Sequence, residues 1–380
     1  MKKKQNIIFE ESLKSTISKK SNNPKEKKKI INIFNNLIQE KEKIKNNFYY
    51  LSKRFKLNFD KKDIDKFQKY QTVAIIGMGG SILGSKAIYK FFEGVTKKRF
   101  IFFDNLDLYK IELLKNKLNL QKVLIIIISK SGNTLETLSI LNLLKNKKIN
   151  NKNTIIITEN KHNSLQEFSK KYKIYMVAHK NYVGGRYSVL TETGMLPAYL
   201  MGLHINNFRK NLSSATKVQG KILFKILPLM KKIYLSKKYN TIIFLNYCPK
   251  LNDFLFWCQQ LMAESLGKNG KGLLPVISVA PRDHHSLLQL YLDGPKDKLF
   301  YFFSQESSNI SGAKKNIFDK SFGKIKSKNI DTIVEAQKKA LVDVFKKKKI
   351  PFREFRMLRL NEESLGELFS YFMIETALIG

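Results

Sequence analysis

The stretch Val123-Leu124-Ile125-Ile126-Ile127-Ile128-Ser129-Lys130-Ser131-Gly132-Asn133-Thr134 decides the fold of this chain. Its first six residues are all apolar and mostly β-branched, and such a run without alternation is typical of a strand buried on both faces of a parallel sheet. A polar loop follows at once, and residues 134–144 then have the apolar spacing of a helix. Strand, loop and helix in this order predict one half of a βαβ unit.

The same pattern repeats on both sides of this stretch. Similar short apolar runs occur before and after it, and the strand pattern restarts near residue 240. The predicted strands are 72–76, 100–103, 123–128, 154–157, 174–177, 241–245 and 299–303, and the predicted helices include 81–92, 108–118, 134–144, 164–171, 330–345 and 362–379. The sequence therefore predicts an α/β fold with two domains, each a mainly parallel β-sheet flanked by α-helices.

Changes in this pattern indicate the domain boundaries. Residues 1–65 are rich in Lys and Asn and carry apolar residues at helical spacing, which predicts an N-terminal helical arm. We expect the first α/β domain over residues 66–200, a helical connection over 201–230 and the second α/β domain over 231–380. The length of 380 residues agrees with two domains of this kind.

The composition is strongly basic, with a formal net charge of +39 at pH 7. A charge of this size is compatible with nucleic-acid binding. However, only eight of the 70 cationic residues are Arg, which is the residue suited to bidentate contacts with phosphate and guanine. The 62 Lys residues are spread along the whole chain together with Asn and Ile, which indicates a biased overall composition. We therefore expect no nucleic-acid partner.

The cysteine content and the hydropathy pattern indicate where the protein works. Two cysteines are too few for a disulfide framework or a four-Cys zinc site, and they suit a reducing compartment. The basic N-terminus lacks the apolar run of a signal peptide, and no window approaches the ~20 apolar residues of a transmembrane helix. The sequence predicts a cytoplasmic protein without a membrane partner.

The loop after the 123–128 run has the composition of a phosphate site. Ser129, Lys130, Ser131 and Thr134 lie at the carboxyl end of a predicted parallel strand, where open α/β sheets bind ligands. Hydroxyl groups and backbone N–H groups at a helix N-terminus can hold a phosphate without a metal. Helix capping by Ser131 or Asn133 is the alternative, but it accounts for only two residues of the cluster.

A second loop, Gly77-Met78-Gly79-Gly80-Ser81, follows the predicted strand 72–76 and opens a helix. Its glycines allow a ligand to approach the backbone closely, and a helix N-terminus attracts anions. The loop matches the G-x-G-x-x-G dinucleotide fingerprint imperfectly, and Asp104 is only a weak candidate for the acidic residue that the fingerprint requires. A tight turn without a ligand is the alternative.

Two charged residues further along are candidates for catalysis. Arg186 follows Gly184-Gly185, and a guanidinium aimed by such a bend could hold a phosphate or stabilise an oxyanion; a surface salt bridge is the alternative. Glu264 lies near the end of an apolar helical stretch over 254–263, where the helix dipole disfavours an anion. A low-polarity setting there would suit a general base, whereas a solvated helix end would have no such role.

The segment Asp283-His284-His285-Ser286, followed by Gln289, contains two of the five histidines. Adjacent residues on regular structure point in different directions, so we expect at most one of the two to face a site. A zinc centre is not expected, because neither a Cys nor a third suitably spaced His accompanies them.

Taken together, these segments resemble the glucose-6-phosphate isomerase (phosphoglucose isomerase) family, in order from about Thr72 to Gly380. The residues that carry the resemblance are Gly184-Gly185-Arg186-Tyr187-Ser188 with Gly194-Met195-Leu196-Pro197, Ser129-Lys130-Ser131-Gly132-Asn133-Thr134, Glu264-Ser265-Leu266-Gly267-Lys268 and Asp283-His284-His285-Ser286. The family has two sugar-isomerase (SIS) domains, in agreement with the two α/β units. The resemblance implies reversible interconversion of glucose 6-phosphate and fructose 6-phosphate in glycolysis and gluconeogenesis, with neither a metal nor an organic cofactor.

The resemblance also implies a role for each site residue. The substrate-binding residues would be Ser129, Lys130, Ser131, Thr134, Gly80, Ser81 and Gln289. Glu264 would move the proton between C1 and C2 through a cis-enediolate, and Arg186 would stabilise that intermediate. His285 would assist ring opening from the neighbouring subunit, which implies a homodimer.

One departure from the family concerns the end of the chain. The family continues beyond the helix that matches residues 362–379 with a segment containing a Gln and a functional Lys that helps to open the sugar ring, whereas this sequence stops at Gly380. We expect the sequence to be a fragment. If it is complete, we expect impaired ring opening with enolisation intact.

Two alternative functions remain open at this point. A bifunctional phosphoglucose/phosphomannose isomerase would share the same plan, although the Gly185-Arg186-Tyr187-Ser188 signature argues against it. A regulator with SIS domains would bind a sugar phosphate without turning it over and would not need Glu264. No helix-turn-helix is evident in the N-terminal arm, which makes the regulator less favoured.

Overall fold

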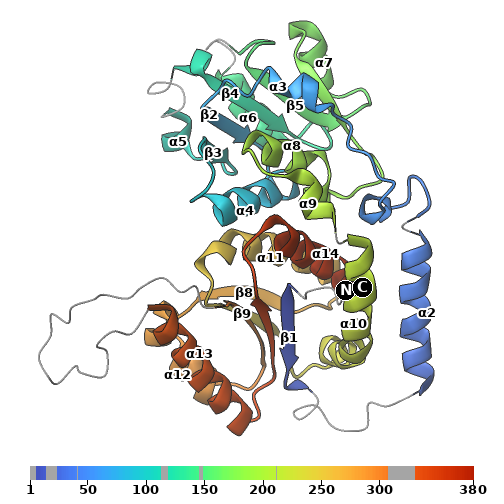
Figure 1. The fold of residues 1–380 in the computed structure, drawn as a ribbon, viewed down its shortest axis with the longest axis vertical. Coiled ribbons are helices and arrows are strands. Elements are labelled where there is room, and N and C mark those ends of the chain that lie inside the picture. Colours follow the sequence, from blue (N-terminus) through green and yellow to red (C-terminus); the bar gives the residue numbers. More distant parts are fainter. Residues whose placement is uncertain are drawn as a thin grey trace, which may run out of the picture.

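The protein is described from a computed structural model that covers residues 6–13, 24–40, 42–112, 119–144, 149–210, 212–306 and 330–380. Two five-stranded sheets form an upper and a lower lobe in Figure 1, with helices packed around each sheet. The predicted α/β class with two mainly parallel sheets is therefore confirmed. Among the described helices, none combines the length and the hydropathy needed to cross a membrane.

The first sheet has the strand order β3-β2-β4-β5-β6, and all its pairs are parallel. Its strands are β2 (Thr72–Ile76), β3 (Arg99–Phe103), β4 (Val123–Ile128), β5 (Thr154–Glu159) and β6 (Tyr175–His179). The flanking helices are α4 (Leu83–Phe92), α5 (Leu108–Glu112), α6 (Leu135–Leu144) and α7 (Ser164–Tyr172). Every residue of β4 is buried, because this central strand is covered by helices on both faces.

The second sheet has the strand order β1-β10-β9-β7-β8. Its parallel strands are β7 (Thr241–Asn246), β8 (Leu274–Val279), β9 (Lys298–Gln305) and β10 (Phe352–Met357), and its helices are α11 (Asn252–Leu266), α12 (Leu288–Asp293), α13 (Ile330–Lys347) and α14 (Glu362–Ile379). Three helices connect the two sheets: α8 (Glu192–Leu200), α9 (Ile205–Lys210) and α10 (Leu212–Leu235).

The N-terminal segment is only partly the helical arm that the sequence predicts. The helices α2 (Pro24–Glu40) and α3 (Lys61–Asp65) agree with that prediction, and α2 lies beside α10 (Figure 1). Ile7–Glu11, however, forms strand β1, which pairs antiparallel with β10 from Ile7↔Met357 to Glu11↔Arg353. The prediction of a helix-only arm is wrong here, because pairing with the edge of a distant strand outweighs the local helical spacing.

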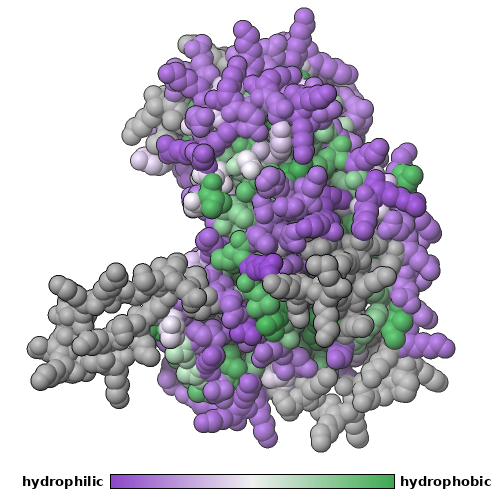
Figure 2. All heavy atoms as spheres, viewed as in Figure 1, coloured by the Kyte–Doolittle hydropathy of each residue, from purple (hydrophilic) through white to green (hydrophobic). Residues whose placement is uncertain are grey.

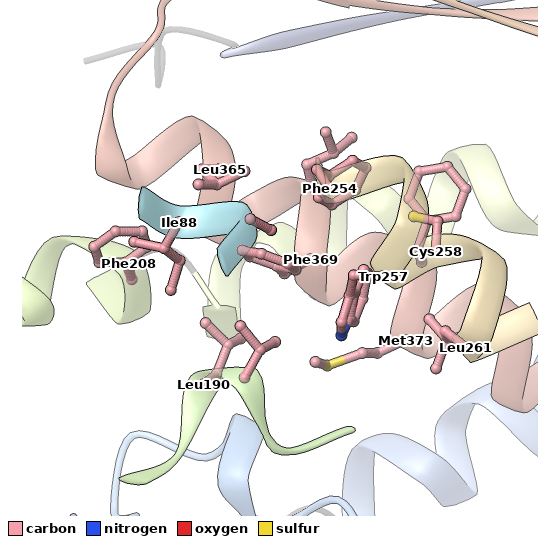
Figure 3. Packing of buried hydrophobic residues seen from close by; sticks show 14 of the residues in the cluster. Ile88, Leu190, Phe208, Phe254, Trp257, Cys258, Leu261, Leu365, Phe369 and Met373 are labelled. Atoms are coloured by element: carbon pink, nitrogen blue, oxygen red, sulfur yellow. The ribbon is translucent and has the colours of Figure 1, made fainter. Parts of the chain in front are cut away.

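The two lobes share one hydrophobic core. Figure 3 shows side chains from α4, α9, α11 and α14 that meet with Leu190, a residue that precedes α8. The indole ring of Trp257 packs edge-on against the Phe369 ring, with centroids 4.7 Å apart and an interplanar angle of 88°. Because α11 belongs to the second lobe and α4 to the first, this core fixes the end of α11 beside the loops of the first sheet.

The second lobe also contains a buried ion pair between β10 and α14. The Arg353 guanidinium donates to both carboxylate oxygens of Glu375 at 2.7 Å, and the two residues are each 1% exposed. Arg353 also donates to the hydroxyl groups of Tyr301 and Tyr371. The pair therefore ties α14, and with it the shared core, to the sheet.

The surface has the character that the lysine-rich composition predicts. Hydrophilic side chains cover most of the face in Figure 2, and hydrophobic side chains come to the surface where the upper and lower lobes meet.

Candidate active site

Two loops meet at the carboxyl edge of the first sheet. Strands β2 and β4 are neighbours, but the chain leaves β2 toward β3 on one side and leaves β4 toward β5 on the other. Ligands of open α/β sheets bind at such a switch point. Residues 77–82 follow β2 and residues 129–134 follow β4, and a Cβ added to Gly77 would lie 2.8 Å from the Ile128 carbonyl oxygen. The two loops predicted to bind the ligand therefore lie side by side.

The loop after β4 gathers hydroxyl groups at the start of α6. The Ser129 Oγ lies 2.7 Å from the Thr134 Oγ1 and 3.5 Å from the Ser131 Oγ, and it accepts a hydrogen bond from the Gly132 N–H at 3.1 Å. Ser129 is 1% exposed and lies on the buried side of the turn, whereas Ser131 is exposed. Hydroxyl groups at the N-terminus of α6 form the kind of cradle that binds phosphate.

Helix capping does not explain this cluster. The Ser131 Oγ accepts from the Asn133 N–H at 3.2 Å, and the Asn133 Oδ1 accepts from the Ser164 N–H at 2.9 Å. Within the described chain, neither side chain has a hydrogen bond to the first turn of α6.

Gly132 has a separate structural requirement in the same loop. Its φ is +71°, and a Cβ there would lie 1.9 Å from the Asn163 Oδ1. Only glycine fits this position.

Lys130 points away from the hydroxyl cluster. Its Nζ donates to the Asn181 carbonyl at 3.0 Å and lies 3.5 Å from the Glu159 carboxylate. The structure thus brings Ser129, Ser131 and Thr134 together but directs the lysine of the same motif toward the ends of β5 and β6.

The loop after β2 touches the segment that carries Arg186. A Cβ on Gly80 would lie 2.3 Å from the Gly185 carbonyl carbon and 2.5 Å from the Arg186 nitrogen, so the two backbones are in direct contact. The Ser188 Oγ also donates to the Gly80 carbonyl at 3.4 Å. Because Gly80 has no side chain, the 3-10 turn Gly79–Ser81 can approach the 3-10 turn Gly185–Leu190 this closely.

Arg186 and Glu264 form an ion pair at this contact. The Arg186 Nη1 lies 2.5 Å from the Glu264 Oε1, and the Arg186 Nε donates to the Ser265 Oγ at 2.7 Å. The Tyr187 hydroxyl lies 3.1 Å from the same Oγ, and the Trp257 Nε1 donates to the Arg186 carbonyl at 3.2 Å. The last turn of α11 therefore holds the guanidinium by its Nε and leaves the Nη groups directed at the carboxylate.

The surroundings of Glu264 differ from the low-polarity setting considered in the sequence analysis. Its side chain is 53% exposed and that of Arg186 is 21% exposed. An exposed ion pair contributes only about 0–1 kcal/mol to stability. A ligand that offers its own oxyanion to Arg186 can therefore displace the carboxylate at little cost, and the carboxylate then becomes available as a base.

Gln260 also lies in this cluster and is not among the residues predicted from the sequence. It lies one turn before Glu264 on α11, and its Nε2 donates to the Glu264 Oε2 at 3.3 Å. Its Oε1 is buried and has no hydrogen-bond partner among the described residues. The i, i+4 spacing from Glu264 is the signal that could have identified it.

The segment after β8 lies apart from this cluster. The Asp283 carboxylate accepts from the Val279 N–H at 2.7 Å and from Arg282, and the His284 Nε2 lies 2.8 Å from the Tyr247 hydroxyl. His285 and Gln289 are exposed, and no hydrogen bond in the described chain joins either of them to Glu264 or to the hydroxyl cluster. Within one chain, the structure does not bring these two predicted residues into the site.

The described residues contain no group of three His, Cys, Asp or Glu side chains arranged to hold a metal. The functional groups at the switch point are hydroxyls, backbone N–H groups, one guanidinium, one carboxylate and one amide. This set can bind a phosphate, accept a proton from carbon and stabilise an oxyanion.

Comparison with known proteins identifies relatives over most of the chain. The sequence profile of the phosphoglucose isomerase family matches residues 17–274. The chain is 32% identical over 330 residues to the glucose-6-phosphate isomerase of Methanocaldococcus jannaschii, which covers 84% of this chain and 81% of that protein. It is 31% identical over 418 aligned positions to the glucose-6-phosphate isomerase of Mycoplasmopsis pulmonis, which covers 99% of this chain and 92% of that protein.

Solved structures show the same fold. A hypothetical protein from Thermus thermophilus superimposes with a TM-score of 0.78 at 22% identity, covering 94% of this chain and 91% of that one. A glucose-6-phosphate isomerase from Chlamydia trachomatis superimposes with a TM-score of 0.70 at 18% identity, covering 84% of this chain and 68% of that one. The structural likenesses concern the fold, and the sequence matches decide the family: the chain belongs to the phosphoglucose isomerase family.

Proposed function

We propose that the chain interconverts glucose 6-phosphate and fructose 6-phosphate by proton transfer through a cis-enediolate. The observation that supports this proposal is the Arg186–Glu264 ion pair at 2.5 Å, carried by a segment that contacts the loop after β2, which in turn adjoins the loop with the hydroxyl groups. Moving a proton on the carbon next to a carbonyl requires a base, a cation for the enediolate oxygen, and an anchor that positions the substrate. The site contains one group for each of these tasks.

Glu264 acts as the base. In the open-chain aldose its carboxylate removes the C2 proton, and the electron pair moves to the C1 carbonyl oxygen to give the enediolate. The Glu264 carboxylic acid then returns the proton to C1. A proton moves from O2 to O1 of the enediolate in the same step, and the product is the ketose. The Gln260 amide donates to the second carboxylate oxygen and orients it.

Arg186 stabilises the negative oxygen of this intermediate. Its Nε is held by Ser265, which fixes the plane of the rigid guanidinium, so a substrate oxygen that takes the place of the Glu264 carboxylate meets the same Nη1 group. A preorganised guanidinium acts most strongly where negative charge develops, which is in the transition state.

The phosphate of the substrate binds the hydroxyl cradle. Ser131 and Thr134 present their hydroxyl groups at the N-terminus of α6, and Ser129 holds both in place. Gly80 and Ser81 border the cradle from the neighbouring strand. Lys130 adds positive charge from the side rather than a direct contact.

In the described part of the chain, the histidine proposed for ring opening does not reach this site. His285 and Gln289 are exposed on the second lobe. A homodimer in which His285 reaches the site of the neighbouring subunit would bring this histidine to the sugar ring. The proposed location is the cytoplasm, where glucose 6-phosphate and fructose 6-phosphate are interconverted in glycolysis and gluconeogenesis.

The test is conversion of fructose 6-phosphate to glucose 6-phosphate by the wild type and by Glu264→Gln, with a chelator present. Loss of a general base lowers kcat by about 10²–10⁴-fold, while the phosphate cradle keeps substrate binding intact. The matched control is Glu93→Gln. Glu93 is also half-exposed and forms an ion pair, with Lys90 at 2.8 Å, but it lies outside the site. Equal rates for the two variants would contradict the proposed role of Glu264.

The same assay separates the two alternative functions. A regulator would bind the sugar phosphate but would show no turnover in the wild type. A bifunctional enzyme would turn over mannose 6-phosphate at a rate comparable to that of glucose 6-phosphate.

A further inference from the structure

A cavity of about 840 Å³ lies on the first lobe, away from the catalytic cluster. Three parts of the chain line it: the segment between α2 and α3, the end of β5 and the turn after β6. The lining residues are Ile44, Lys45, Tyr49, Arg54, Lys56, Asn58, Glu159, Asn160, Lys161, His179, Lys180, Asn181 and Tyr182. None of them is a residue that the proposed isomerisation uses, although Glu159 and Asn181 contact Lys130 of the loop after β4.

Hydrogen bonds tie the walls of this cavity to one another. The Arg209 guanidinium donates to the carbonyl groups of Tyr50 and Leu190 at 2.7 Å, which ties the N-terminal segment to the first lobe. The Asn58 amide donates to the Ala178 carbonyl at 2.7 Å, and the Asn58 N–H donates to Glu192 at 2.8 Å. The segment between α2 and α3 therefore crosses the first lobe along a fixed course (Figure 1). A preformed cavity binds a ligand without the cost of ordering its walls.

The charge of the lining is strongly positive. It contains five cationic side chains and one carboxylate, that of Glu159. This carboxylate is already paired with Lys161 at 2.6 Å and with Lys130 at 3.5 Å. In the described chain, Lys45, Arg54 and Lys56 have no ion pair with any acid. Cations that converge on a concave surface concentrate positive potential there, which a random scatter of lysines over a convex surface does not do.

One of these cations has an unusual backbone conformation. Lys45 has a φ of +66°, in the left-handed region that side-chain-bearing residues seldom adopt. Such a residue at the rim of a cavity is an observed outlier of the kind that clusters at binding sites.

The rest of the lining favours a ligand with hydroxyl groups. Burial lowers the pKa of His179 to about 4, so this ring is neutral at physiological pH. The His179 Nδ1 donates to the Lys180 carbonyl at 2.9 Å, which leaves the Nε2 as an acceptor for a hydroxyl group. The rings of Tyr49 and Tyr182, with centroids 6.4 Å apart and an interplanar angle of 55°, provide apolar surface beside the cations.

We propose that this cavity is a second anion site, which binds a multiply charged phosphate ester with free hydroxyl groups, of the sugar-phosphate or nucleotide class. The volume lies within the range of small-molecule sites, roughly 300–1,000 Å³. The cavity lies at the carboxyl ends of β5 and β6, on the same edge of the sheet as the catalytic cradle and beginning at the strand next to β4. The proposal does not rest on the isomerase activity.

The test compares two double variants of the full chain that remove the same charges with the same spacing. Arg54→Gln/Lys56→Gln removes two exposed cations from the cavity, and Lys97→Gln/Arg99→Gln removes two exposed cations near the opposite end of the sheet. Titration calorimetry at physiological salt measures the dissociation constants for inorganic pyrophosphate, ADP and fructose 1,6-bisphosphate. A third variant, Ser129→Ala/Thr134→Val, removes the catalytic cradle.

We expect at least one probe to bind the wild type saturably. Its affinity should be at least about tenfold weaker in Arg54→Gln/Lys56→Gln, because this variant loses charge-assisted hydrogen bonds to phosphate. In Lys97→Gln/Arg99→Gln the affinity should stay within about twofold of wild type. Tighter binding of ADP or of the bisphosphate than of pyrophosphate would identify the nucleotide or sugar source. The proposal would be overturned by equal weakening in the two charge variants, by the absence of saturable binding, or by loss of binding in the cradle variant. None of these outcomes depends on turnover, so failure here leaves the proposed isomerase function intact.

Discussion

The contact between Gly80 and Gly185 offers a sharp test of how the site is assembled. A Cβ on Gly80 would lie 2.3 Å from the Gly185 carbonyl carbon, whereas ordinary contact begins near 3.4 Å. The neighbours are backbone atoms that cannot rotate away, so Gly80→Ala must separate the two turns by about 1 Å. Overpacking of this kind costs about 1–3 kcal/mol of unfolding free energy.

The larger effect is expected on catalysis. Arg186 follows Gly185 directly, so the same displacement moves the guanidinium away from the loop after β2. A misplacement of about 1 Å can lower the rate by about 10²-fold. The measurements are kcat/KM for fructose 6-phosphate and the urea dependence of unfolding, on Gly80→Ala and wild type in parallel.

A control within the same fold keeps this test interpretable. A Cβ on Gly94 meets no atom within 4 Å, and its φ is not in the left-handed region, so Gly94→Ala should leave both quantities unchanged. A Gly80→Ala variant with kcat/KM within twofold of wild type would refute the argument that this glycine sets the position of Arg186.

Three further predictions concern other parts of the chain. Ser265→Ala removes the acceptor of the Arg186 Nε, so kcat should fall about tenfold with little change in KM, and Ser265→Thr should restore most of it. Glu375→Gln leaves the buried Arg353 without its charge partner and should lower the unfolding free energy by about 3–5 kcal/mol, measured in urea. Burial lowers the pKa of His179 to about 4 from an ordinary 6.5. Between these two pH values the unfolded state binds more protons than the folded state, so the free energy of unfolding decreases as the pH falls from 6.5 to about 4. His179→Gln should remove that pH dependence, and its persistence in the variant would contradict the assignment.

The sequence determined the first sheet almost completely. The predicted strands 72–76 and 123–128 agree with β2 and β4, because runs of buried β-branched residues have no other stable place in an α/β fold. The loops after these two strands were also identified from sequence, since ligand-binding loops follow the carboxyl ends of parallel strands.

Three strands of the second sheet were missed for physical reasons. β10 contains Arg353 and Glu354, and charged residues argue against a buried strand unless partners for them are known. The structure supplies those partners from α14 and α13, where Glu375 and Lys338 neutralise them. β8 contains a proline that β-propensity disfavours, and β1 is a strand only because the exposed edge of β10 is available to it.

What the sequence determined was therefore the kind of fold, and the loops and chemical groups of the candidate site remain its predictions. Only the tertiary structure decided which of those groups meet. Arg186 and Glu264 come from different lobes and touch because one hydrophobic core holds α11 against α4, whereas Lys130, although it lies within the cradle motif, turns to the carboxylate of Glu159. Local periodicity reports which side of a helix or strand is buried, but the direction of a side chain depends on partners far away in the sequence, and these are set only when the elements pack.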